Sequence, residues 1–431
     1  MRSGAHIKAA IEVLVEVSER HRPAASALSD WGKSHRFAGS GDRAAIGNLL
    51  YDTLRRRRSL AAQMGADSPR AVVLAAAPGA LGLSATAVAA SADGSPHAIE
   101  PLSEAERAGL SRLIPSDAPA SVRGDYPDWL EPSFARAFGA SAAEEGRALA
   151  RRAPLDLRVN TLKADRPKVL KALAHVAALP TPLSPLGVRL PAPEGQARLP
   201  NVEAENGHGR GWFEVQDEGS QIAALMAGAG PRTQVLDICA GAGGKTLAFA
   251  ATMRNTGQIY AYDGEATRLR PIFERLKRAD VRNTQVLRAG DRGALSALGD
   301  RFDIVFVDAP CTGTGAWRRR PDAKWRLRPI NLQQRTGEQA ALLEAAAPFV
   351  KPGGRLVYAT CSVLPEENGD RITAFLANHS GFAMLPWREP WHRGIGGEAP
   401  LSADGSEATL LLTPARHGTD GFFIAVLART K

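Results

Sequence analysis

The sequence predicts a doubly wound α/β domain preceded by a helical domain, and three observations lead to this prediction. From about Gly211 onward, apolar strand-like runs alternate with helical patterns, which is typical of βαβ units around a parallel sheet. Residues 1–125 instead carry apolar side chains at helical spacing. Residues 126–208 form a small α+β segment that ends in a proline-rich connector. We therefore predict domains at 1–125, 126–208 and 209–431.

The composition indicates an ordinary globular protein with a polyanionic partner. Hydrophobic residues make up 44% and charged residues 23%, which excludes a disordered tail, a fibrous repeat and a membrane bundle. The net charge of +9 favours a nucleic acid as partner. The three cysteines form no CxxC pair and the nine histidines show no zinc spacing, so neither a disulfide scaffold nor a metal site is expected. We expect a monomer in the cytoplasm, without membrane contact.

The first 125 residues contain two clear amphipathic patterns. Each predicts a helix with one buried face, and the apolar positions are Ile7, Ile11, Leu14 and Val15 in the first, and Ile46, Leu49, Leu50 and Leu54 in the second. The second pattern ends in four arginines, 55–58, which we interpret as a solvated helix terminus in preference to a phosphate-binding patch. The charge-free run 71–91 is too rich in small residues to span a bilayer and predicts a buried helical hairpin.

The middle of the chain is punctuated by prolines and glycines. Residues 114–132 are predicted to be a linker. Residues 155–163 are strand-like, and 167–179 follow a helical pattern. Six prolines between Pro180 and Pro200 then predict an irregular connector.

Chemically useful side chains stand at the ends of the predicted parallel strands. Because ligands of open α/β sheets bind beyond the carboxyl ends of the strands, these side chains indicate a site. The runs are QVLDICA (Gln234–Ala240), QIYAYD (Gln258–Asp263), TQVLRAGD (Thr284–Asp291), FDIVFVDAPC (Phe302–Cys311) and GRLVYATCS (Gly354–Ser362).

A glycine-rich loop, Cys239–Thr246, follows the first of these strands and opens a helix. Its Gly-Lys-Thr ending raises the alternative of a P-loop ATPase, but Cys239 occupies the position of the first glycine that a Walker A loop requires. The other alternative is a nucleoside cofactor without a phosphate to cradle. Asp263 would then accept the ribose hydroxyls and Asp291 would reach the adenine. Each acid alone could equally be a helix N-cap.

Cys311 and Cys361 end neighbouring strands, so both thiols are expected over one pocket, whereas Cys239 is interpreted as a small buried side chain. A thiolate near a methyl donor suits methylation at carbon 5 of a pyrimidine. Addition of the thiolate to carbon 6 makes carbon 5 nucleophilic, and the carbon 5 proton and the thiol must afterwards leave. Asp308 can bond the polar edge of the ring, and the base must be unstacked to enter.

These motifs resemble the RNA (cytosine-5) methyltransferase family, closest to its RsmB-type 16S rRNA branch. The resemblance spans most of 211–431, and it extends more weakly to a NusB-like helical domain through 37–57 and to a small RNA-binding segment through LRVNTLK (Leu157–Lys163). The matching stretches of the catalytic region are WFEVQDEGSQ (Trp212–Gln221), DICAGAGGKT (Asp237–Thr246), DAPCTGTG (Asp308–Gly315), RRRPDAKW (Arg318–Trp325), ATCSVLPEEN (Ala359–Asn368) and DGFF (Asp420–Phe423).

The resemblance implies a Rossmann-like sheet, S-adenosyl-L-methionine as cofactor and 16S rRNA as partner. It assigns the nucleophile to Cys361 and product release to Cys311. Asp308 and Lys245 complete the predicted catalytic set. The predicted cofactor contacts are Cys239, Ala240, Gly241, Ala242, Gly243, Gly244, Lys245, Asp263, Asp291 and Asp308. The family commonly has Ala-Pro where this chain has Gly241-Ala242, a departure that adds backbone freedom.

A run of six cations and two tryptophans, 317–328, follows Cys311. We interpret it as phosphate contacts with a stacking surface beside the pocket, in preference to a solvated loop. Three alternatives to rRNA methylation remain open from the sequence. These are methylation of cytosine in tRNA, a non-catalytic RNA-binding assembly factor, and the ATPase above.

Overall fold

The computed structural model describes residues 1–430 except 194, 196 and 198, so three positions of the predicted connector and the last residue, 431, lie outside the described residues. The chain divides into two compact units. One comprises Met1–Arg152 and Trp317–Arg328, with a short stretch of the connector. The other holds the remaining residues, including both sheets.

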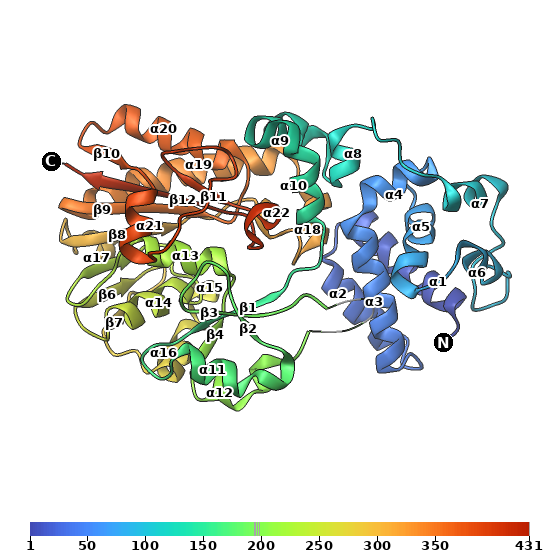
Figure 1. The fold of residues 1–431 in the computed structure, drawn as a ribbon, viewed down its shortest axis with the longest axis horizontal. Helices are drawn as coiled ribbons and strands as arrows, with labels where there is room; N and C mark the ends of the chain where they lie inside the picture. Colours follow the sequence, from blue (N-terminus) through green and yellow to red (C-terminus); the bar gives the residue numbers. More distant parts are fainter. Residues whose placement is uncertain (194, 196, 198, 431) are drawn as a thin grey trace. The chain divides into compact units, whose positions relative to one another are not determined.

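The first unit is helical (Figure 1). Its core is formed by the apolar faces that the sequence predicted, since Ile7, Leu14, Ile46 and Leu50 are all fully buried. Its α-helices are α1 (Ser3–Glu19), α2 (Ala24–Ser34), α3 (Ser40–Arg55), α4 (Arg57–Met64), α5 (Pro69–Leu81), α6 (Ala85–Ala90), α7 (Glu104–Ser111), α8 (Ala120–Gly124), α9 (Glu131–Phe138), α10 (Ala142–Leu149) and α18 (Pro321–Arg326).

Two sequence-based expectations for this unit need revision. The predicted linker 114–132 contains α8 and the start of α9, because Val122, Tyr126 and Leu130 are buried and tie the segment to the helices around it. The predicted hairpin over 71–91 is present as α5 and α6, but only α5 is largely buried. In the run of arginines, Arg55 is the last residue of α3, and Arg57 and Arg58 begin α4. Three of them pair with Asp52, Asp67 and Asp128, which leaves little of this charge uncompensated.

The insertion Trp317–Arg328 is held in the helical unit by buried polar contacts. Lys324 is 1% exposed, and its Nζ donates to the carbonyl oxygens of Arg55 (2.9 Å) and Asp125 (2.6 Å). The indole nitrogen of Trp325 donates to the carbonyl of Leu54 at 2.6 Å. Burial lowers the pKa of Lys324 to about 8.

We predict that this lysine makes the helical unit more stable at alkaline pH. Between pH 8 and pH 10.5 the unfolded chain keeps the Lys324 proton and the folded chain releases it, so raising the pH favours folding. The gain is at most about 3 kcal/mol. Urea unfolding followed by tryptophan fluorescence should show this rise in wild type and lack it in Lys324→Met. Parallel pH profiles for the two proteins would contradict it.

The second unit contains a four-stranded antiparallel sheet, in the order β2-β3-β1-β4. Helix α11 (Arg166–Ala172) ends before the predicted limit of 179, since the chain turns there into β2. Strand β3 was missed inside the proline-rich stretch, where Val188 and Leu190 are buried. The strands are β1 (Leu155–Val159), β2 (Leu179–Pro180), β3 (Gly187–Leu190) and β4 (Phe213–Val215).

The large sheet confirms the predicted parallel arrangement. Its order is β10-β12-β9-β8-β5-β6-β7, with β11 paired to β12. The five strands predicted from the sequence are mutually parallel, whereas β12 runs antiparallel to β9, β10 and β11. The strands are β5 (Gln234–Asp237), β6 (Gln258–Ala261), β7 (Thr284–Val286), β8 (Phe302–Asp308), β9 (Val350–Thr360), β10 (Phe382–Leu385), β11 (Leu410–Leu412) and β12 (Phe422–Arg429).

Helices flank this sheet, with α13 and α14 together on one side and α19 and α20 together on the other (Figure 1). No helix within the described residues is both long enough and apolar enough to cross a membrane. The remaining helices of the unit are α12 (Asn206–Gly209), α13 (Glu218–Met226), α14 (Gly244–Thr252), α15 (Ala266–Leu269), α16 (Ile272–Ala279), α17 (Arg292–Ser296), α19 (Pro329–Ala346), α20 (Gly369–Asn378), α21 (Arg388–Gly394) and α22 (Pro414–His417).

Candidate active site

The strand order reverses between β5 and β8, and the glycine loop lies at this switch point. The loop joins β5 to α14, and it turns through Gly241 and Gly243, whose φ angles are +49° and +83°. A Cβ atom on Gly243 would lie 2.5 Å from Cγ1 of Ile272, so only glycine fits against α16 at this position. The loop therefore brings backbone close to any ligand beyond these strands.

Lys245, in the first turn of α14, reaches across to the end of β8. Its Nζ lies 2.6 Å from Oδ2 of Asp308 and 4.9 Å from the centre of the Phe422 ring. The lysine side chain is 8% exposed, whereas that of Asp308 is 32% exposed. The ion pair thus presents a carboxylate, not an ammonium group, to the outside of the strand ends. A lysine engaged in this way does not suit a phosphate-binding P-loop.

Asp237, at the end of β5, is fully buried and anchors the start of α14. Its Oδ2 accepts a hydrogen bond from Oγ1 of Thr246 at 2.6 Å, while Oδ1 has no partner among the described atoms. Burial raises the pKa of Asp237 to about 7. An unsatisfied buried carboxylate oxygen beside the glycine loop fits a site that is completed by a ligand.

Asp263 and Asp291 follow the neighbouring strands β6 and β7 but differ in their surroundings. Asp263 is 2% exposed, and its carboxylate accepts from the backbone nitrogens of Gly241 (3.0 Å) and Glu265 (2.9 Å). Asp291 does not end its strand as predicted, because β7 stops at Val286 and the acid caps α17 instead. The preceding Gly290 donates to the carbonyl of Asp263, which keeps the two loops in contact.

The two thiols that follow β8 and β9 meet as predicted. These strands are adjacent and parallel, and the Sγ atoms of Cys311 and Cys361 are 3.4 Å apart. The contact with Cys361 and burial together raise the pKa of the Cys311 thiol well above its usual value. Cys311 therefore stays protonated beside Cys361. Cys239 follows β5 and is half-buried, and partial burial raises its thiol pKa as well.

Glu367 positions the Cys311 loop, and sequence reasoning missed it. Its carboxylate accepts hydrogen bonds from the backbone nitrogen of Thr312 (2.8 Å), from the hydroxyl of Thr312 and from Nε2 of Gln339 (3.0 Å). The same amide group of Gln339 donates to the carbonyl of Pro310 at 3.0 Å. Glu367 is fully buried within ATCSVLPEEN, so its position in that motif was the only available signal.

Three charged residues that were not predicted from the sequence, Arg158, Glu214 and Arg275, hold the glycine loop. Arg158 of β1 is fully buried, and its Nη1 donates to the carbonyl of Gly244 at 2.6 Å. Arg275 of α16 donates to the carbonyl of Ala242 at 2.8 Å and also pairs with Glu214 of β4. Arg158 and Glu214 are cross-strand partners in the small sheet. The small sheet therefore fixes two carbonyls of the loop.

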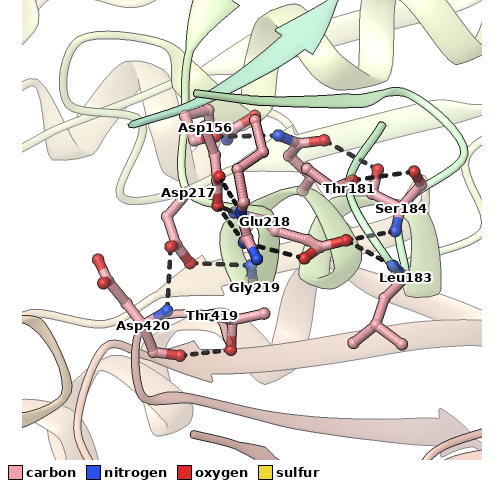
Figure 2. A network of polar contacts seen from close by, with 12 residues as sticks. Asp156, Thr181, Leu183, Ser184, Asp217, Glu218, Gly219, Thr419 and Asp420 are labelled. Carbon is pink, nitrogen blue, oxygen red and sulfur yellow. Dashed lines mark hydrogen bonds and ion pairs between the residues drawn. The ribbon is translucent and has the colours of Figure 1, made fainter. Parts of the chain in front are cut away.

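A second polar network joins the small sheet to the large one (Figure 2). Glu218 accepts from the backbone nitrogens of Leu183 (2.6 Å) and Ser184 (2.7 Å), and its own nitrogen donates to Asp156 of β1. Asp217 accepts from the nitrogen of Asp420, which precedes β12. Asp217 and Glu218 both lie in the stretch WFEVQDEGSQ, so this part of the motif connects the two sheets.

The basic run after Cys311 does not form the stacking surface predicted from the sequence. Trp317 is 1% exposed and stacks on Phe134, and Arg318 is 4% exposed. Lys324 and Trp325 are engaged in the helical unit as described above. Sequence reasoning failed here because cations beside tryptophans occur equally in buried cation–π and hydrogen-bonded packing.

Comparison with known proteins identifies the family. Residues 225–428 match the family model described as 16S rRNA methyltransferase RsmB/F, and residues 126–195 match the ferredoxin-like domain of the same group. A probable ribosomal RNA small subunit methyltransferase B from Synechocystis sp. is 33% identical over 75% of this chain and 71% of its own length. The chain belongs to the RsmB/F family. It is accordingly an RNA methyltransferase that depends on S-adenosyl-L-methionine.

Other relatives agree with this RsmB/F assignment. The ribosomal RNA small subunit methyltransferase B of Photorhabdus laumondii is 32% identical over 70% of this chain and 66% of its own length. A methyltransferase homologue from Pyrococcus horikoshii superposes with a TM-score of 0.60 and 28% identity, covering 74% of this chain and all of the other. NSun6 from the same organism, solved with SFG, shares the fold with a TM-score of 0.62 and 22% identity over 71% of this chain and 98% of its own.

We predict that Arg158→Lys weakens binding of S-adenosyl-L-methionine by about tenfold. Lysine keeps the charge, but its side chain is one atom shorter, so its ammonium group cannot reach Gln216 and Gly244 as Nη1 of Arg158 does. The loop then loses one of the two carbonyl contacts that hold it. Isothermal titration with the cofactor measures the effect. Arg278→Lys is the matched control, because Arg278 pairs with the same Glu214 without touching the loop. Equal affinities of Arg158→Lys and wild type would contradict the prediction.

Proposed function

We propose that this RsmB/F family member methylates carbon 5 of a cytosine in small-subunit ribosomal RNA, with Cys361 as the nucleophile. The single observation that supports it best is the 3.4 Å approach of two thiols beyond adjacent parallel strands. The relatives are themselves named as small-subunit rRNA methyltransferases, which favours this RNA over tRNA. Among the described residues, no group of three or more metal-ligating side chains is placed to hold a metal ion.

The residues present fit a bound S-adenosyl-L-methionine. The loop 239–245 would hold it, with Asp263 and the backbone near Asp291 completing the site, and the glycines allow backbone to approach it closely. Asp237, two residues before this loop, keeps an unpartnered Oδ1. When bound, the cofactor supplies an electrophilic methyl group on a sulfonium.

The chain's own residues then act on the cytosine. Cys361, as thiolate, adds to carbon 6, so that the electron pair of the 5,6 double bond becomes available at carbon 5 for methyl transfer. Asp308, the exposed member of its ion pair with Lys245, accepts from the exocyclic amino group of the ring, and the ammonium group of Lys245 offsets the negative charge that develops on addition. Loss of the carbon 5 proton to a solvent water restores the double bond and expels the thiolate of Cys361, to which the S–H of Cys311 can donate a hydrogen bond.

Under this proposal the helical residues 1–125 and the segment 126–208 contact RNA, and residues 209–431 carry out catalysis. Bisulfite sequencing of total RNA from cells with and without the protein tests the function directly. We expect one or a few small-subunit rRNA cytosines to lose protection when the protein is absent. If only tRNA cytosines lost protection, the substrate would be tRNA and not rRNA. If no cytosine in any RNA changed, cytosine C5 methylation would be refuted.

A further inference from the structure

The helical unit contains a basic groove between α2 and α3 that lies outside the site described above. The groove has a volume of about 800 Å³. Three of its described lining residues are cations and none is an acid. The lining residues are Ala25, Leu28, Ser29, Gly32, Lys33, Arg36, Arg43 and Tyr51. A concave surface with this charge suits a polyanion.

Of the three cations of the groove, the acids of these two helices pair only with Lys33. Asp42 is held by the N-terminal ammonium group at 2.6 Å and by His6, and Asp52 is held by Arg55 at 3.1 Å and by Arg152. Asp30 pairs with Arg22 and also with Lys33. Lys33 is therefore partly compensated by a carboxylate.

The two arginines of the groove differ from Lys33 in their ion pairing. Arg36 and Arg43 are exposed and have no carboxylate partner among the residues that the structure describes. The Nε of Arg43 donates to the carbonyl of Ala38, which fixes the side chain and leaves its terminal nitrogens available.

Aromatic rings accompany these cations. Phe37 follows Arg36 directly and is 71% exposed, so its ring is open to a stacking partner. It contacts the ring of His35 edge-on, and His35 stacks on Trp31 with ring centres 4.2 Å apart. Tyr51 forms part of the groove wall. Cations that follow a phosphate backbone, next to exposed rings that stack on bases, are typical of single-strand binding.

We propose that this groove binds an unpaired RNA segment, with Arg36 and Arg43 on phosphates and Phe37 stacked on a base. The inference rests on the proposed function only in naming RNA as the polyanion. Its role is to hold the substrate at a second point, on a different unit from the one that carries the thiols. Single-stranded RNA is favoured over duplex because a base can reach the ring of Phe37 only when it is unstacked.

The test uses the full chain and a fluorescein-labelled single-stranded RNA of mixed sequence, about 12 nucleotides long. Fluorescence anisotropy without cofactor gives the affinity at several salt concentrations. For the double variant R36E/R43E we expect at least tenfold weaker binding, and the slope of log K against log salt should fall by about 1.4, the value for two lost single-strand phosphate contacts. For Phe37→Ala we expect about fivefold weaker binding with an unchanged slope.

The control is R20E/R107E, which makes the same charge change in the same unit, just after α1 and on α7, at two exposed arginines outside the groove. It should bind within about twofold of wild type. Equal losses in R36E/R43E and this control would overturn the proposal, as would an unchanged slope in R36E/R43E. An equal effect of R36E/R43E on a duplex of the same sequence would overturn the assignment to an unpaired strand.

Two further measurements separate the possible failures. Urea unfolding followed by tryptophan fluorescence shows whether the helical unit of R36E/R43E is folded. If it is not, R36Q/R43Q and Phe37→Ala decide the question by the same criteria. A wild-type chain that binds no RNA would refute the proposed function itself, whereas a variant that binds RNA as wild type does would refute only the groove.

Discussion

Replacement of Cys361 by alanine is expected to abolish methyl transfer and every covalent enzyme–RNA adduct. Without the thiolate, carbon 5 of the aromatic ring is too weak a nucleophile to take the methyl group, so the rate should fall by roughly 10⁴-fold or more, the scale on which loss of a covalent nucleophile is felt in enzymes. Transfer of a radiolabelled methyl group to RNA measures the rate, and a denaturing gel shows the adduct.

The surroundings of Cys361 make this a clean experiment. Its flanking residues Thr360 and Ser362 are fully buried, and the side chain of Asn368 bonds both of them. The main chain at position 361 also accepts from the nitrogen of Gly315 at 3.0 Å. Because none of these contacts involves the thiol, Cys361→Ala should bind S-adenosyl-L-methionine with wild-type affinity. Turnover by this variant close to the wild-type rate would eliminate Cys361 as nucleophile.

The parts of the site that could be predicted from sequence are the residues that follow the carboxyl ends of the parallel strands. A parallel sheet brings every carboxyl end to one edge, so Asp308, Cys311 and Cys361 could be placed near one another without coordinates. The glycine loop could be placed for the same reason, since it leaves a strand and opens a helix. The helical core followed from the 3.6-residue period of its apolar positions, as at Leu50.

The parts that could not be predicted depend on contacts between distant segments. Arg158 lies 86 residues from the Gly244 carbonyl that it holds, and nothing in its local pattern marks it as more than one residue of a strand. Glu367 and Gln339 are 28 residues apart on different elements. The same limit explains the error at Lys324, whose acceptors are carbonyls of α3 and of the residue after α8. Charge alone gave no indication that this lysine would be buried.

The contacts that hold the carbonyls of Ala242 and Gly244 link the small sheet to the glycine loop. Arg158 and Glu214 face each other across β1 and β4, and through Arg275 they fix the carbonyls of Ala242 and Gly244. Burial by itself would raise the pKa of Glu214, but Arg275 and Arg278 hold it below its usual value, so Glu214 stays charged at neutral pH. Any RNA that contacts the small sheet therefore bears on the loop assigned to the cofactor.

Replacement of Cys311 by alanine is expected to leave the covalent adduct intact and to stop its breakdown. The Cys311 S–H lies 3.4 Å from the Cys361 sulfur and stays protonated, so it can stabilise that sulfur as it departs from carbon 6. Without this donor, turnover should fall by about 10²-fold or more, as for loss of a general acid. A denaturing gel should then show a slow band that contains protein and disappears on ribonuclease treatment.

The double variant C311A/C361A decides between the two thiols, since it should give no band if Cys361 forms the bond. The reverse pattern, with the band in Cys361→Ala and none in Cys311→Ala, would exchange the two roles. The gel therefore decides which of the two neighbouring sulfur atoms bonds carbon 6.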